Sequence, residues 1–183
     1  MKKLVAALSL MVLVVGLVAC GNDDNGNGSD DTGSAVTDGV LVMGTSADYY
    51  PFQFIDLETG DFAGFDIDLA HYIADALGYE LEIVDMEFGS LITSLRNERV
   101  DMVLAGMSAT DERREVVDFS NVYYQANNGT ILTFAGTINS SDDLAGLTIG
   151  VQTGSIQQQI GEALIEDGYD IELVIMDRIP ELV

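Results

Sequence analysis

The amino-acid sequence predicts an α/β fold with a mainly parallel β-sheet. Short apolar runs rich in Val, Ile and Leu alternate with segments of helical periodicity from residue 40 onward. Glycines stand where several of the helical segments end. The chain has 183 residues, 48% of them hydrophobic, which is enough for one domain or two small ones with an apolar core. Strands and helices that alternate in this way form α/β folds.

The residues before this region predict export and a tether. Residues 1–19 combine two lysines with an apolar run shorter than the roughly 20 residues of a membrane span, which predicts a signal peptide. The letters LVAC at residues 17–20 resemble a bacterial lipobox, so Cys20 is the predicted lipidation site; the alternative is a lone cysteine in an uncleaved anchor. Because the chain has one cysteine, it forms no internal disulfide. Residues 20–38 are acidic and rich in Gly and Asn, as expected of a flexible linker.

The first series of elements begins with an apolar run. We expect a strand at residues 40–45 and a loop at residues 46–54, in which Pro51 excludes a regular helix. Turn signals predict a hairpin-like excursion at residues 57–65.

Two helices and two strands are expected next. Asp66 is the predicted N-cap of a helix at residues 67–78, which ends at a glycine. Ser90 is the predicted cap of the second helix. The remaining elements are a strand at residues 79–86, the second helix at 89–100 and a near-continuously apolar strand at 100–107, typical of a buried parallel sheet.

Residues 131–183 repeat the alternation on a smaller scale. The expected elements are a β-rich run at 128–136, a short capped helix at 139–146, a strand at 147–152, a helix at 153–168, a strand at 170–176 and a first helical turn at 177–183. So few residues make a small independent core. We therefore expect this part either to pack on the first part or to be a fragment of a longer domain, and we favour the fragment.

The charge of the chain narrows the classes of partner. It carries 31 acidic and seven basic residues, a net charge of −24. Removal of residues 1–19 with Lys2 and Lys3 lowers this charge to −26. Such a charge argues against binding nucleic acid, and against binding an anionic membrane except through a lipid. It attracts cationic solutes, although adaptation to a salty or alkaline habitat explains it as well.

The segment AGMSATDERREVVDFS, residues 105–120, predicts an anion site at a strand–turn–helix junction. Gly106 lets the backbone approach a ligand, Ser108 offers a hydroxyl, and Thr110 is a good N-cap. Arg113 then falls at the third helical position. Free N–H groups, a hydroxyl and a guanidinium at one point suit a small carboxylate.

The alternative for this segment is a solvated helix face. In that interpretation Arg113 and Arg114 pair with Glu115 or Asp111 and bind nothing.

Four segments occur in an order and at a spacing that resemble one protein family. They are ADYYPFQF at residues 47–54, GFDIDLAHYIADALG at 64–78, FGSLITSLRNERVDMVLAGMSATDERREVVDFSNVYY at 88–124 and LAGLTIGVQTGSIQQ at 144–158. Together they resemble the bacterial extracellular solute-binding proteins of family 3, which serve ABC transporters of polar amino acids such as arginine, glutamine and cystine. The resemblance covers about residues 38–183.

The resemblance implies a two-lobed clamshell of the periplasmic-binding-protein type II class. Lobe 1 would span residues 39–130, and residues 131–183 would form part of lobe 2, with a hinge crossing near 128–135. Family members are longer, so we expect this sequence to be truncated at its C-terminus. The implied protein is a monomer without catalytic activity, cofactor or metal. It binds a free amino acid outside the cell, delivers it to ABC permease subunits, and is held on the outer face of the membrane through Cys20.

The resemblance also implies roles for single residues. Arg113 would clamp the α-carboxylate of the ligand, helped by Ser108 and by the backbone of Gly106. Tyr49 and Phe88 would enclose the ligand side chain; the alternative for both is an ordinary place in the core.

Four further positions match the family pocket. Ser46 is a polar position within it, and Ala105 replaces a serine common in the family. Ser155 and Gln157 would close over the ligand from lobe 2; a helix cap and a solvated helix residue are the alternatives. The Asp or Glu that holds the ligand's α-amine would lie beyond Val183.

More than one ligand and more than one class of protein fit the sequence. The acidic balance of the chain favours arginine as the ligand. A carboxylate at position 46 or 53 would indicate a basic ligand, but Ser46 and Gln53 are neutral, so glutamine and cystine are still possible ligands. An extracellular sensor domain and a cyclohexadienyl-dehydratase-like enzyme share this fold. The single histidine, His71, has helical spacing with Asp68 and Asp75 that suits a metal, but a solvated helix face explains the three residues better.

Overall fold

The structure is a computed structural model that describes residues 39–125, 131–133 and 138–182, all within the unit Gly33–Val183. The predicted signal peptide, Cys20 and the linker lie outside the described residues, as does most of the predicted hinge crossing. No helix within these ranges is long and apolar enough to cross a membrane.

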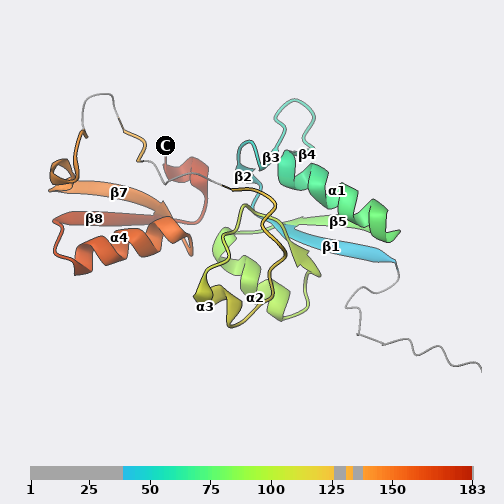
Figure 1. Cartoon of the computed structure of the whole chain (residues 1–183). Coiled ribbons are helices and arrows are strands. Elements are labelled where there is room, and N and C mark those ends of the chain that lie inside the picture. Colours follow the sequence, from blue (N-terminus) through green and yellow to red (C-terminus); the bar gives the residue numbers. More distant parts are fainter. Residues whose placement is uncertain (1–38, 126–130, 134–137, 183) are drawn as a thin grey trace, which may run out of the picture. The chain divides into compact units, whose positions relative to one another are not determined.

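A parallel three-stranded sheet organises residues 40–103. β1 (Val40–Thr45) lies between β5 (Glu80–Asp85) and β6 (Met102–Val103), and both pairings are parallel, as predicted. The register joins Val40 to Glu80 and Thr45 to Asp85, so β1 and β5 end together at the same edge (Figure 1). β6 is shorter than predicted because Gly106 turns the chain with a φ of 57° soon after the strand.

The core of this part lies between the sheet and α1 (Phe65–Leu77). Met43 from β1 and Leu104 pack with Ile67 and Ala70 of the helix, and all four are buried. The apolar residues recur at the helical spacing that the sequence shows, so one face of α1 meets the sheet. The helix ends at Gly78, which has the left-handed conformation expected of a C-terminal cap.

One predicted helix cap is wrong, and the other, Ser90, is the N-cap by position but makes no side-chain capping bond. Helix α1 begins one residue before Asp66, with Gly64 as its N-cap, and the Asp66 carboxylate turns into the protein instead. α2 (Leu91–Arg96) follows a single 3₁₀ turn, η1 (Phe88–Ser90). Ser90 already has helical backbone angles, so its hydroxyl donates back to the Glu87 carbonyl at 2.7 Å rather than accepting from the helix.

A small antiparallel sheet occupies the region predicted as a loop and a hairpin. β2 (Asp48–Tyr49) pairs with β3 (Gln53–Ile55), which pairs with β4 (Phe62–Ala63). The hairpin prediction is confirmed by the β3–β4 pair. The loop prediction missed β2 and β3, since their two or three residues give no periodicity to read.

The second series of elements follows the expected order. β7 (Leu147–Gln152) and β8 (Ile171–Met176) are parallel, and α4 (Ile156–Glu166) runs beside them (Figure 1). A 3₁₀ turn, η2 (Ser141–Leu144), precedes β7 behind a capping box, and η3 (Ile179–Leu182) follows β8. Of the β-rich run expected at 128–136, only residues 131–133 are described, and they are not a strand. The two lobes and their boundaries stay a prediction.

Gly64 gives a test of the junction between β4 and α1. Its φ is 121°, and a Cβ there would lie 2.7 Å from the carbonyl carbon of Phe52. Gly60 also has positive φ, at 79°, but has open space around it. We expect Gly60→Ala to lower the free energy of unfolding by about 1–2 kcal/mol for conformation alone. Gly64→Ala should cost at least about 2 kcal/mol more because it also clashes. Urea unfolding measures both, and equal losses would contradict the clash.

Candidate functional site

The residues predicted to bind ligand gather around one cavity of about 260 Å³. Eight of the nine predicted positions line it: Tyr49, Phe88, Ala105, Gly106, Ser108, Arg113, Ser155 and Gln157. Ser46 is buried and does not line the cavity; its hydroxyl donates to the Asp48 carboxylate at 3.1 Å. That these residues contact a ligand stays a prediction.

The strand–turn–helix motif has the local geometry that the sequence predicts. α3 (Asp111–Arg114) begins after Thr110, whose hydroxyl accepts from the Arg113 backbone N–H at 3.3 Å. Gly106 supplies the turn, and a Cβ at this position would lie 3.2 Å from the Tyr49 ring. The absence of a side chain at residue 106 therefore brings Tyr49 against the turn.

Arg113 is a buried cation beside the cavity. Its side chain belongs to a residue only 6% exposed, and its guanidinium donates to the Ser108 carbonyl at 2.7 Å and the Gly154 carbonyl at 2.9 Å. The guanidinium also lies 5.7 Å from the centre of the Phe88 ring. Burial lowers the pKa of Arg113 from its ordinary value, which the nearby Glu112 opposes. A guanidinium has five N–H donors, so donors remain for a carboxylate.

The ion pairs that the alternative interpretation assigns to the two arginines do not form in the described part of the chain. Arg114 is exposed, with its guanidinium 5.3 Å from the Phe119 ring centre. Within the described ranges, the one ion pair shorter than 4.0 Å joins Arg178 to Asp85. Neither Arg113 nor Arg114 is therefore paired with the carboxylates of its own helix.

Asp66 stabilises the turn at Gly106, which lines the cavity. Its carboxylate is fully buried and accepts from the Gly106 N–H at 2.8 Å and from the Tyr123 hydroxyl at 3.1 Å. Burial raises the pKa of Asp66, and the two hydrogen bonds oppose this shift. The Gly106 N–H already donates to Asp66. If the backbone of Gly106 contacts a ligand, it therefore does so through its carbonyl oxygen.

The other predicted residues differ in burial. Tyr49 is 41% exposed and stacks on Phe52 at 5.2 Å between ring centres, so it is not an ordinary core residue. Ser155 is buried and caps α4 by accepting from the Gln158 N–H at 3.1 Å, while it also lines the cavity. Gln157 is exposed and lines the cavity as well.

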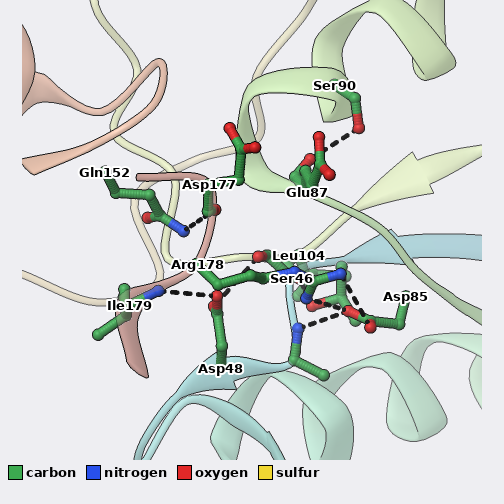
Figure 2. Close-up of polar contacts among 12 residues, drawn as sticks. Ser46, Asp48, Asp85, Glu87, Ser90, Leu104, Gln152, Asp177, Arg178 and Ile179 are labelled. Atoms are coloured by element: carbon green, nitrogen blue, oxygen red, sulfur yellow. Dashed lines mark hydrogen bonds and ion pairs between the residues drawn. The ribbon is translucent and has the colours of Figure 1, made fainter. Parts of the chain in front are cut away.

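Sequence reasoning missed Asp48 and left the place of Gln53 open. Of the residues that line the cavity, Asp48 and Arg113 carry charge, one of each sign. Asp48 accepts from the Ile179 N–H at 3.1 Å, as Figure 2 shows, and Ile179 also lines the cavity. Gln53 is 1% exposed, and its Oε1 is the buried side-chain polar atom without a partner in the described part of the chain. No local pattern marks Asp48, because its partner lies 131 residues away.

Comparison with known proteins identifies the family. Residues 41–166 match the profile of the bacterial extracellular solute-binding proteins, family 3. The chain belongs to this family.

Individual family members named for amino acids are similar over most of this chain. It is 42% identical to the arginine-binding extracellular protein ArtP of Bacillus subtilis over 183 residues, which is all of this chain and 68% of ArtP. It is 34% identical to a probable histidine-binding protein of Campylobacter jejuni over 96% of this chain and 69% of that protein.

A solved structure supports the fold. The crystal structure of the substrate-binding protein of an amino acid ABC transporter superposes with a TM-score of 0.73 at 42% identity, over 79% of this chain and 63% of that one. The mixed α/β fold is therefore that of the family's amino-acid-binding proteins. The chain spans about two thirds of the length of these relatives.

Asp66→Asn tests the buried carboxylate. Because the pKa of Asp66 is raised above 3.8, the folded chain binds more protons than the unfolded chain between 3.8 and the raised value. The stability that this group contributes is full below pH 3.8 and is lost as pH rises through its folded pKa. The free energy of unfolding of the wild type minus that of Asp66→Asn, measured by urea titration, should therefore fall as pH rises above 3.8.

Asp68→Asn provides the control for the loss of one negative charge, because Asp68 is an exposed residue of the same helix. A difference for Asp66→Asn that stays constant or rises with pH would contradict the assignment.

Proposed function

We propose that this chain binds a polar amino acid, with arginine favoured, outside the cell and delivers it to an ABC importer. The observation that carries the proposal is the buried Arg113 guanidinium at a cavity whose other charged lining residue is Asp48. The carboxylate of an amino acid complements Arg113, and the positive charge of a basic side chain would complement Asp48.

Arg113 is prepared to receive a carboxylate. Its position is fixed by the Ser108 and Gly154 carbonyls and by the Phe88 ring, so little side-chain entropy is lost when a ligand binds. A planar guanidinium matches the two oxygens of a carboxylate better than a lysine would. Ser108 offers a hydroxyl next to this position, and Tyr49 and Phe88 offer apolar surface to a ligand side chain.

A basic amino acid is the favoured ligand. The two relatives reported above are named for arginine and histidine, both of which carry basic side chains. Asp48 and the charge of −24 also favour a cation. Ser46 and Gln53 are neutral, so glutamine and cystine remain alternatives to be tested in the same titration.

The place of the protein follows from the same proposal. Signal-peptide cleavage before Cys20 and lipidation of its sulfur would anchor the chain on the outer face of the membrane as a monomer, near the permease subunits. The relatives are named as binding proteins, and the described residues that line the cavity include neither histidine nor cysteine. Nothing in the cavity favours the sensor or the dehydratase-like enzyme over a binding protein.

Arg113→Ala tests the proposal. We expect arginine affinity to fall at least about 30-fold, because the ligand carboxylate would be left in the cavity without its cation. Calorimetric titration of the whole secreted protein that carries this sequence, with arginine, lysine, histidine, glutamine and cystine, measures the loss and ranks the ligands.

The matched control is Arg114→Ala, which removes the same charge from the exposed neighbour. Its affinity should change less than about twofold. Equal losses in both variants, or no binding of any amino acid by the folded wild type, would reject the proposal.

A further inference from the structure

Arg178, in the segment after β8, binds the C-terminal residue of β5. Arg178 donates from Nη1 to Asp85 Oδ1 at 2.8 Å and from Nη2 to Asp85 Oδ2 at 3.1 Å, the two-pronged arrangement visible in Figure 2. Asp85 also accepts from the Ala47 N–H at 2.9 Å, just after β1. The Asp85 carboxylate thus joins the carboxyl ends of two strands to Arg178.

The next residue makes a second contact in the same direction. The Ile179 N–H donates to Asp48 Oδ2 at 3.1 Å, while Asp48 Oδ1 accepts from Ser46. Two consecutive residues, 178 and 179, are therefore bound to two different carboxylates that follow β1 and end β5.

This attachment sets one wall of the cavity. Ile179 and Leu182 belong to η3, which begins directly after Arg178, and both line the cavity. Leu182 packs against the bare backbone of β7, because a Cβ on Gly150 would lie 3.0 Å from a Leu182 methyl carbon. The place of these two apolar side chains depends on where the segment is held.

A partly exposed ion pair by itself usually contributes little. The Arg178 and Asp85 side chains are 28% and 34% exposed. Here the pairing is bidentate, and the backbone of the next residue adds a contact. The carboxylates of Asp85, Asp48 and Glu87 also raise the pKa of Arg178, against the effect of partial burial. The guanidinium therefore lies in a field of three carboxylates and not beside one.

We propose that Arg178 is a positioning residue for ligand binding: by pairing with Asp85 it holds η3 in place, so that Ile179 and Leu182 close the cavity against a bound amino acid. The inference rests on the proposed function. Because the pair is reached by solvent, salt should weaken both the attachment and the affinity for ligand.

The experiment compares Arg178→Met, Asp85→Asn and the double variant in the whole secreted protein. Arginine affinity is measured by calorimetry at about 0.02 M and about 0.5 M NaCl. We expect each single variant to weaken binding about fivefold at low salt, and the double variant to be no worse than either. The wild type should approach the variants at high salt. Arg178→Lys should recover part of the loss, because it restores the charge without the two-pronged geometry.

The control is Arg99→Met, which removes the same charge from an exposed arginine of the first part. Its affinity should stay within about twofold of the wild type at both salt concentrations. Amide hydrogen exchange without ligand reports on η3 directly, and exchange at residues 179–182 should be faster in Arg178→Met than in Arg99→Met.

Unchanged affinity in Arg178→Met, whatever happens to the exchange rates, would overturn the inference. So would additive losses in the double variant, because they show that the two residues act separately. If Arg178→Met fails to fold, Asp85→Asn and the salt dependence of the wild type decide in its place. A wild type that binds no amino acid rejects the proposed function itself, whereas normal wild-type binding with no effect at residue 178 rejects this inference alone.

Discussion

The site depends on how the chain stabilises the buried charge of Arg113. Arg113 as a residue is 6% exposed, so its guanidinium loses most of its hydration and persists only where protein groups replace water. The Ser108 and Gly154 carbonyls and the Phe88 ring do so here. These contacts leave some of the N–H donors of the guanidinium free to bind an anion from solvent. The same contacts that make the burial of Arg113 tolerable also fix the direction in which it presents its remaining donors.

The surrounding structure supports this arrangement through groups far apart in the sequence. Asp66, at the start of α1, takes the Gly106 N–H and the Tyr123 hydroxyl, which holds the turn that leads to α3. A buried carboxylate without donors would destabilise the fold, so Asp66 and the turn are mutually dependent. A second cation, Arg178, ties η3 to the strand ends on which the same cavity opens. In a chain with 31 acidic residues, two of the five arginines, Arg113 and Arg178, thus lie where more than one oxygen acceptor converges.

Sequence reasoning succeeded where the physics is local. The alternation of apolar and helical segments predicted a mainly parallel sheet, and the pairs β1–β5 and β7–β8 are parallel. The spacing from Thr110 placed Arg113 at the third position of a helix. Sequence reasoning failed where an interaction spans the chain. Asp66 resembled a helix cap, yet its partner lies 40 residues away, and the contact between Asp48 and Ile179 spans 131 residues. Such partners are chosen by sheet register and packing, which no short pattern encodes. The family resemblance gathered eight positions at one cavity, but it placed Ser46 there too, and Ser46 does not line it.

The role proposed for Arg113 is to hold the carboxylate of an amino acid. The most direct measurement is a calorimetric comparison of arginine with agmatine, which has the same guanidinium side chain and an amine but no carboxylate. We expect arginine to bind and agmatine to bind at least about 30-fold more weakly, because the buried cation would then stay unpaired. Equal affinities for the two ligands would contradict this role and would assign recognition to the guanidinium end of the ligand alone.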